Sequence, residues 1–282
     1  PNALHCTMKN TIFTNVAINN DDMTVWWEKL DKNPPVNATE WKGTKVNGPE
    51  YVAAGNNLAH PNSRFTAPAE NCPCISPEFN NPQGVPISAI IFGGRRAKTT
   101  PLVYQSFDWA HGTFIGSAVS SETTAAATGA VGVLRHDPMA MKPFCGYHMA
   151  DYWGHWLEMG KKLGDKAPKI FNVNWFKQDD DGNFIWPGFG DNMRVLDWII
   201  ERCEGNADAV ETPIGYVPTK DAINTEGIED EVTPEIMDKL LAVDTDLWKA
   251  EVADLREFYK QFGDRLPAEI KAQLDGLESR LG

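Results

Sequence analysis

The chain has 282 residues, of which 23% are charged and 42% hydrophobic, and its formal net charge is −13. These values predict a soluble globular protein with one large domain or two smaller ones. The acidic balance argues against a general nucleic-acid binder, which needs a basic face. The apolar runs are too short to span a bilayer, so we expect no membrane partner.

The cysteines are few and odd in number, five in all, which indicates reduced thiols. No leader-like segment opens the sequence, so we expect a cytoplasmic protein. Cys72 and Cys74 are the one close pair and lack a second pair at zinc-ribbon spacing, which favours free thiols.

The first third of the chain is typical of short strands joined by loops. Residues 10–17 alternate and are β-branched, which predicts a strand, and residues 24–27 predict another. The stretch 31–84 is rich in Pro, Asn and Gly and contains His60-Pro-Asn-Ser-Arg-Phe65. A loop arginine such as Arg64 is usually only solvated, although its planar fork of donors suits a carboxylate or a phosphate.

Residues 86–92 predict a buried strand that runs directly into Gly93-Gly94-Arg95-Arg96. Two glycines let a backbone approach a ligand closely, and two cations follow them at the strand end. The alternative is a solvated arginine pair after a turn.

Residues 103–119 predict a helix followed by a strand, and residues 120–132 are small and rich in Ala and Gly. This second stretch is typical of either a short Ala helix or a mobile loop. His136-Asp137 and the pair His148 and His155 lack the spacing of a ligand set, so we predict no metal site.

Residues 169–175 predict a strand that leads into a segment with five aromatic residues within fifteen positions: Trp175, Phe176, Phe184, Trp186 and Phe189. The acidic run Asp179–Asn183 predicts a hairpin turn between them. Asp191 or Asn192 is predicted to cap a helix that ends near Gly205. That helix should bury Leu196, Ile199, Ile200 and Cys203.

Flat rings on a hairpin beside an amide could hold a planar heterocycle, with the rings stacking and the Asn192 amide reading its edge. The alternative is that the rings are only the core of the hairpin. From Thr233 onward, a capping Thr, Pro234, Gly263 and Pro267 predict helices to the end of the chain.

The segment Asn174-Trp175-Phe176, followed by Trp186-Pro-Gly-Phe-Gly-Asp-Asn192 and Arg194-Val-Leu196, resembles the guanine-binding segment of the GTP-dependent phosphoenolpyruvate carboxykinase family. The resemblance implies that Phe176, Phe184 and Phe189 enclose guanine and that Asn192 reads its edge. The implied nucleotide-binding set also includes Arg64, Arg95, Trp175, Gly190 and Asp191.

The resemblance assigns further roles outside this segment. It places Arg95 at the terminal phosphate of the nucleotide, and it places Asn62, Ser63 and Arg64 at oxaloacetate or phosphoenolpyruvate. Residues 120–132 correspond to a lid that closes over the active site, with Glu122, Thr124 and Ala126 in the implied catalytic set beside Arg64 and Arg95. Thr128 and Gly129 stand where an acidic residue and a basic residue or His often occur, so this lid departs from some members.

The implied fold is α/β, a mixed-sheet nucleotide-binding C-terminal domain with a helical C-terminus. Residues 1–84 should face the substrate, and residues 85–282 should bind the guanine nucleotide. The implied reaction of the parent is that of a gluconeogenic lyase, a decarboxylase and kinase, which converts oxaloacetate and GTP to phosphoenolpyruvate, carbon dioxide and GDP.

No Gly-x-x-x-x-Gly-Lys-Ser/Thr occurs in the chain. The resemblance implies that the phosphate loop and the manganese or magnesium ligands lie upstream of Pro1, and we expect the fragment alone to be an inactive monomer. One alternative is a guanine-nucleotide-binding module without catalysis. A weaker one is an unrelated carbohydrate- or adenine-binding aromatic hairpin.

Overall fold

The computed structural model describes residues 9–28, 30–123 and 132–282. The chain divides into two compact units, Pro1–Val85 and Pro86–Gly282. Each unit has its own sheet and its own core, and each is described here by itself.

A small antiparallel sheet forms the centre of the first unit. Its strands are β2 (Ala17–Asn19), β3 (Val25–Trp26), β4 (Asn37–Thr39) and β5 (Lys45–Asn47), in the order β3-β2-β4-β5. Helix α2 (Gly48–Ala53) follows β5, with the Asn47 side chain capping its first turn. The buried core of this unit consists of Ala17, Trp26, Ala38 and Leu58.

A separate strand pair carries the arginine of the first unit. Strand β1 (Ile12–Thr14) pairs antiparallel with β6 (Arg64–Thr66), and two short 3-10 turns, Ala69–Asn71 and Pro77–Asn80, follow β6. The single strand expected over residues 10–17 is therefore two, β1 and β2. Asn15 separates them with a φ of 59°, a left-handed conformation that ends a strand.

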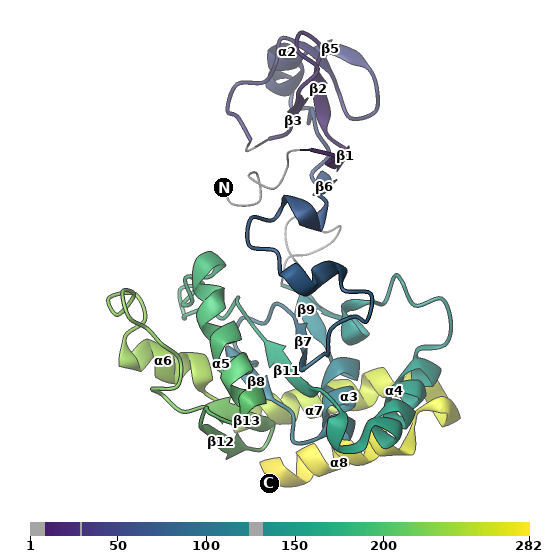
Figure 1. The fold of residues 1–282 in the computed structure, drawn as a ribbon, viewed down its shortest axis with the longest axis vertical. Helices are drawn as coiled ribbons and strands as arrows, with labels where there is room; N and C mark the ends of the chain where they lie inside the picture. Colours follow the sequence, from purple (N-terminus) through teal and green to yellow (C-terminus); the bar gives the residue numbers. More distant parts are fainter. Residues whose placement is uncertain (1–8, 29, 124–131) are drawn as a thin grey trace. The chain divides into compact units, whose positions relative to one another are not determined.

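The second unit is built on a five-stranded mixed sheet with the order β12-β13-β8-β11-β7 (Figure 1). These strands are β7 (Ala89–Gly93), β8 (Val103–Gln105), β11 (Lys169–Val173), β12 (Ala209–Thr212) and β13 (Gly215–Pro218). Strands β7 and β11 are parallel, with Val173 opposite Gly93, and the other pairs are antiparallel. Because β7 and β11 are parallel, their carboxyl ends lie at the same end of the sheet. The segments that follow these two strands therefore start close together.

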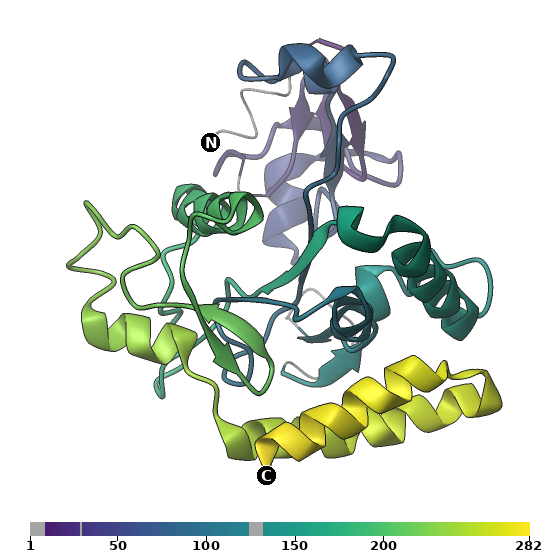
Figure 2. The same ribbon diagram turned by 60° about the horizontal axis from the view of Figure 1, so that its bottom comes forward.

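Helices cover both faces of this sheet. Helices α3 (Trp109–Ser117), α4 (Met149–Leu163), α7 (Thr245–Tyr259) and α8 (Ala268–Leu281) share one core with Ile170 of β11. Helices α5 (Asn192–Glu204) and α6 (Pro234–Leu241) share the other with Phe171. Adjacent residues of a strand point to opposite faces, which explains this division. The α/β class with a mixed sheet and a helical C-terminus is confirmed; α7 and α8 lie side by side in Figure 2.

The order of elements over residues 103–119 is the reverse of the prediction, because strand β8 comes first and helix α3 second. Asp108 caps α3 by accepting a hydrogen bond from His111 N. Gly112 lets the helix approach β11 closely, since a Cβ there would lie 2.4 Å from Ile170 Cδ1. The small residues of this stretch therefore serve helix packing.

Helix α5 ends as predicted, because Gly205 is its C-terminal cap with a left-handed φ of 85°. Its buried face is shifted from the predicted one. Val195, Trp198 and Ile199 are buried, whereas Ile200 is exposed and Leu196 and Cys203 are half-buried. Trp198 is the largest side chain on this helix, and it sets the face that turns inward.

Residues 120–122 form strand β9, which pairs antiparallel with β10 (Leu134–His136). The start of the predicted lid is therefore extended and not part of an Ala helix. Residues 124–131, which include Thr124, Ala126, Thr128 and Gly129, lie outside the described residues.

Cys72, Cys145 and Cys203 are free thiols. Among the described residues, no helix is both long and apolar enough to cross a membrane.

Candidate functional site

Asn174 joins the two loops that follow the parallel strands β7 and β11. It is fully buried directly after β11. Its Nδ2 donates to Arg96 O at 2.8 Å and to Thr100 O at 2.9 Å. Its Oδ1 accepts from the backbone N–H groups of Arg96, at 3.3 Å, and Phe176, at 3.2 Å. The amide therefore joins the loop after β7 to the start of the aromatic segment, a role the sequence did not predict.

Arg95 extends from this loop over the Phe176 ring of the aromatic segment. Its guanidinium carbon lies 5.8 Å from the centroid of the Phe176 ring, within range of a cation–π contact. Its Nε is buried and has no hydrogen-bond partner among the described residues. Arg95 thus keeps donor capacity beside an aromatic surface.

Gly94 approaches a neighbouring strand instead of open space. A Cβ at this position would lie 2.3 Å from Ser120 O, so only glycine fits between the loop and β9. The sequence predicted a close approach of the backbone to a ligand here. The structure shows a close approach to the strand that precedes the predicted lid.

The aromatic segment forms a hairpin whose turn is acidic, as predicted. Gln178 and Phe184 form a bridge, and Asp179 Oδ1 accepts the backbone N–H groups of Asp181 and Asn183. Phe176 and Phe184 meet edge to face, with ring centroids 5.8 Å apart. The Phe184 side chain nevertheless stays 60% exposed, so this pair does not form a closed core.

Phe189 stands on a tight loop with its ring almost entirely in solvent, at 80% exposed. Gly188 has a φ of 72°, and Phe189 itself has a φ of 54°, a strained value for a bulky residue. A strained backbone holds this large apolar ring in solvent. Such a ring marks a place where another molecule can bind and cover it.

Asn192 and Asp191 do not cap α5 with their side chains, contrary to the prediction. Trp186 Nε1 donates to Asn192 Oδ1 at 2.8 Å. Asp191 instead accepts from Arg194 Nε at 2.9 Å. Both polar side chains at this helix start are therefore used to position neighbours.

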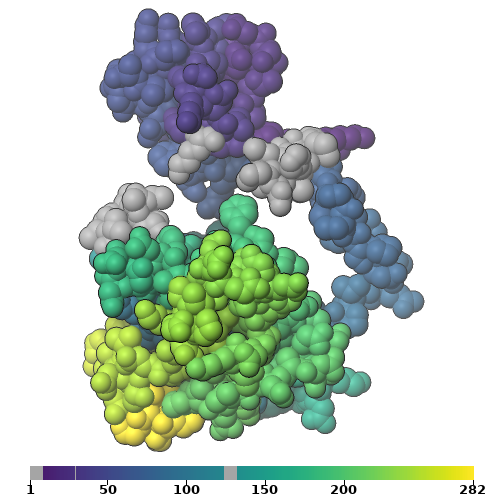
Figure 3. Space-filling view, turned by 90° about the vertical axis from the view of Figure 1, so that its left-hand side faces the viewer, coloured from purple at the N-terminus to yellow at the C-terminus, as the bar shows by residue number. Residues whose placement is uncertain are grey.

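Arg194 also fixes the segment between β13 and α6. Its two terminal nitrogens donate to Asn224 O at 3.0 Å and Glu226 O at 2.9 Å. The same segment buries Ile223 and Val232 against α5 and α6. Its yellow-green surface faces the viewer in Figure 3. The start of α5 is thus held from two sides.

Strand β9 is bonded to the loop that carries Arg95. Arg95 N donates to Ser121 Oγ at 3.1 Å, and Arg95 O accepts from Glu122 N at 2.9 Å. Glu122 Oε1 accepts the backbone N–H of Ala97 at 3.0 Å. The described contacts of the Glu122 carboxylate therefore serve the loop, and its implied catalytic role stays a prediction.

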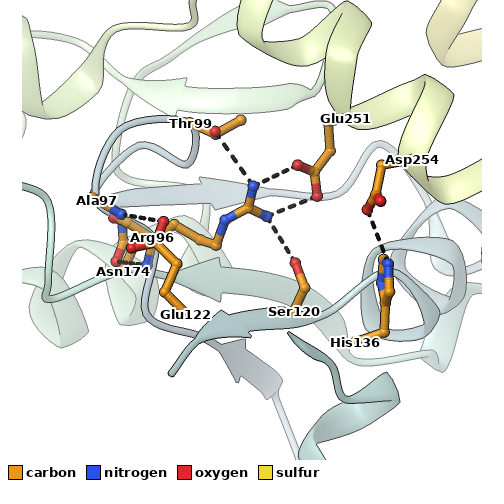
Figure 4. A network of polar contacts seen from close by, with 9 residues as sticks. All are labelled: Arg96, Ala97, Thr99, Ser120, Glu122, His136, Asn174, Glu251 and Asp254. Atoms are coloured by element: carbon orange, nitrogen blue, oxygen red, sulfur yellow. Dashed lines mark hydrogen bonds and ion pairs between the residues drawn. The ribbon is translucent and has the colours of Figure 1, made fainter. Parts of the chain in front are cut away.

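The Arg96 side chain points towards Glu251 of α7 and Ser120 of β9 (Figure 4). Its guanidinium donates to both oxygens of Glu251 on α7, at 2.7 and 2.5 Å, and to Ser120 Oγ at 2.8 Å. Both members of this ion pair are buried. Although burial opposes it, pairing with Glu251 raises the pKa of Arg96. The residue left unassigned by the sequence is thus the one that ties this loop and β9 to α7.

His136 on β10 makes a second contact with α7. Its Nε2 lies 2.9 Å from Asp254 Oδ2, and its ring stacks on Phe258 with centroids 4.0 Å apart. Burial lowers the pKa of His136, and the nearby Asp254 opposes this effect. His136 therefore packs against α7.

Lys177 follows Phe176 in the hairpin and is buried. Its side chain reaches Ala242, with Nζ 3.3 Å from the carbonyl oxygen, and only 7% of the residue is exposed. Burial lowers the pKa of Lys177 to about 8. It lines a pocket with Lys98 and Asp180, which form an exposed ion pair at 2.8 Å.

In the first unit, Asn62, Ser63 and Arg64 lie together at the start of β6. Arg64 Nε donates to Asn62 Oδ1 at 3.1 Å, and Arg64 is exposed. Ser63 and Arg64 border a cavity of about 140 Å³ with Phe13, Val16, Trp27 and Phe65. The structure thus places Ser63 and Arg64 beside a small cavity within one unit, with Asn62 bonded to Arg64. Arg95 and the aromatic hairpin belong to the other unit.

Over the part of the chain that the structure describes, no group of three or more His, Cys, Asp or Glu residues is placed to hold a metal ion.

Helices cover both faces of a mixed sheet, and two loops follow its parallel strands. This arrangement defines a protein of the α/β class. A family model described as the phosphoenolpyruvate carboxykinase C-terminal P-loop domain matches residues 1–280. The chain therefore belongs to the GTP-dependent phosphoenolpyruvate carboxykinase family, as the resemblance predicted.

Curated relatives named phosphoenolpyruvate carboxykinase [GTP] agree with this assignment. The protein from Renibacterium salmoninarum is 52% identical over 285 residues, which cover 100% of this chain and 46% of the relative. Those from Chlamydia caviae and Treponema pallidum are 49% and 48% identical, over 100% and 99% of this chain and 46% of each relative. The chain thus spans about half the length of the curated relatives it matches.

Proposed function

We propose that this chain is the guanine-nucleotide-binding half of a GTP-dependent phosphoenolpyruvate carboxykinase. The observation that carries the proposal is the exposure of two aromatic rings, Phe184 and Phe189, in the segment that leads to a fixed amide, Asn192. A hairpin that only needed a core would bury these rings. A guanine base stacked on them would cover apolar surface that is now in water.

The charge beside the rings suits the phosphates of the nucleotide. Arg95 lies over Phe176, and its buried Nε is unpaired among the described residues. A guanidinium in this position can neutralise phosphate oxygens next to a stacked base. The loop follows β7 at the carboxyl end of a parallel strand pair, where α/β proteins commonly hold ligands.

For the whole protein we propose decarboxylation of oxaloacetate and phosphorylation of the resulting enolate by GTP, the reaction that the family implies. In this chain, Asn62, Ser63 and Arg64 would orient the carboxylate substrate at the cavity beside β6. Residues 120–132 would close over the site and exclude water from the enolate. A manganese or magnesium ion would be held by residues outside this chain. We further propose a cytoplasmic monomer.

A second candidate is a guanine-nucleotide-binding module that has no catalysis of its own. It is favoured by the lack of a Gly-x-x-x-x-Gly-Lys-Ser/Thr sequence and of a metal cluster among the described residues. We expect the 282-residue chain to show no carboxykinase turnover with GTP, oxaloacetate and manganese. Turnover well above a blank would remove this candidate.

Calorimetric titration of the chain with GDP and with ADP tests the proposal. We expect GDP to bind more tightly than ADP, and Phe184→Ala to weaken GDP binding about tenfold because a stacked base contributes about 1–3 kcal/mol per aromatic ring. Phe144→Ala is the matched control, since Phe144 is 81% exposed in the same unit and lies outside the aromatic segment. Equal binding of GDP and ADP, or an unaffected Phe184→Ala, would contradict the proposal.

A further inference from the structure

We infer that Trp186 determines which base this site accepts, because its indole N–H fixes the orientation of the Asn192 amide. The inference rests on the proposed function, since it concerns how the same site distinguishes guanine from adenine. It adds a residue whose side chain lies inside the protein and does not need to touch the base.

The orientation of the amide follows from the chemistry of the pair. Trp186 Nε1 lies 2.8 Å from the Asn192 side chain, and an indole nitrogen can only donate a hydrogen bond. The amide must therefore present its oxygen to Trp186, because the flipped amide would oppose two donors. The N–H2 group of Asn192 is thereby turned away from Trp186.

Both partners are held where they are by other contacts. Trp186 is only 3% exposed and belongs to the core shared with Val195 and Trp198 of α5. Asn192 is the first residue of α5, and the adjacent Asp191 is held by Arg194. Neither side chain can turn freely, so the amide keeps one orientation before a ligand arrives.

A fixed N–H2 group distinguishes the two purine bases. At the same ring position guanine carries a carbonyl oxygen, an acceptor, and adenine carries an amino group, a donor. Guanine can therefore pair with the Asn192 N–H2 group, whereas adenine would oppose donor to donor. A freely rotating amide would serve both bases equally well, since it carries a donor and an acceptor. Selectivity thus depends on Trp186 as well as on Asn192.

Trp186→Phe removes the indole N–H and keeps a large apolar ring. We expect GDP to bind less tightly, ADP to bind more tightly, and the GDP-to-ADP preference to fall about tenfold or more, because the amide can then turn over. Trp198→Phe is the matched control. Trp198 is 1% exposed in the same core and also donates from Nε1, to Asp208 O at 3.3 Å, away from the rings. It should keep the preference of the parent.

Inosine diphosphate, which keeps the ring carbonyl and lacks the 2-amino group, should bind the parent nearly as well as GDP and lose affinity in Trp186→Phe. A Trp186→Phe variant with the full preference of the parent would overturn the inference. If the unsubstituted chain does not prefer GDP to ADP, the proposed function fails, and the inference fails with it.

Proton NMR of the unsubstituted chain gives a second measurement that does not depend on how the variant folds. The Trp186 indole proton should exchange slowly with solvent, and it should stay hydrogen-bonded when GDP is added. An indole proton that loses its protection on GDP binding would overturn the inference, since Asn192 would then have left Trp186.

Discussion

At the scale of single residues, the buried Asn174 side chain fixes the loops of the candidate site. Its amide has two donors and one acceptor oxygen, and each takes part in a hydrogen bond to backbone. Full satisfaction of a buried amide makes it a strong constraint, because any rearrangement leaves a buried polar group without a partner. The relative position of the backbone around Arg95 and Phe176 is therefore set by the hydrogen bonds of Asn174.

Lys177 gives a prediction about stability at the same scale. Its folded pKa of about 8 lies below the usual lysine value of 10.5, because burial disfavours the charged amine. The charge therefore destabilises the folded state fully below pH 8 and ceases to do so as the pH rises towards 10.5. Lys177→Met should raise the free energy of unfolding at pH 7 by up to about 3 kcal/mol, measured by denaturant titration.

The gain from Lys177→Met should shrink between pH 8 and pH 10, which distinguishes lost charge from better packing. Lys98→Met is the matched control, because Lys98 is exposed and paired with Asp180. It should give no gain in stability at pH 7. A Lys177→Met variant whose gain is the same at pH 7 and pH 10 would contradict the assignment.

At the scale of elements, the loop after β7, strand β9 and helix α7 are joined by the buried pair of Arg96 and Glu251 (Figure 4). Glu251→Gln should cost about 3–5 kcal/mol of unfolding free energy, since it leaves the Arg96 charge buried without its carboxylate. Amide exchange at Glu122, whose N–H bonds to Arg95 O, should become faster.

The double variant Arg96→Met with Glu251→Leu should recover most of the lost stability, because apolar side chains of similar size often replace a buried ion pair at little cost. If Glu251→Gln alone were as stable as the parent, the pair would not hold these elements together.

Much of the second unit could be predicted from local patterns. Strand β11, the acidic turn at Asp179 and the end of α5 at Gly205 each depend on residues close in sequence, so the pattern specified them. The predicted order of helix and strand over residues 103–119 was wrong. Gly112 is small because it packs against β11, more than fifty residues away along the chain. The sequence could not show which side a small residue faces.

The candidate site also has features that the sequence predicted and features that only the structure shows. The aromatic positions are close in sequence and form a recognisable motif, and the structure brings Phe176 and Phe184 together. The partners that orient them depend on the tertiary fold. Neither the bonding of Asn174 across two loops nor the pairing of Arg96 with Glu251, 155 residues away, leaves a signal in a single sequence.

At the scale of the whole molecule, the two units carry different parts of the proposed chemistry. Asn62, Ser63 and Arg64 lie in the first unit, and Arg95 with the aromatic hairpin lies in the second. The residues proposed to recognise the base all belong to the second unit, so variants within that unit test this part of the proposal. The chain spans about half the length of its curated relatives, and we assign the complete reaction to the whole protein.

The structure of this chain with GDP bound would test the central claim most directly. The account predicts that the guanine ring lies among Phe176, Phe184 and Phe189, with its carbonyl oxygen within hydrogen-bond distance of Asn192 Nδ2 and the phosphates towards Arg95. A base bound elsewhere on the protein, or a base in this place with Asn192 turned away from it, would contradict the account.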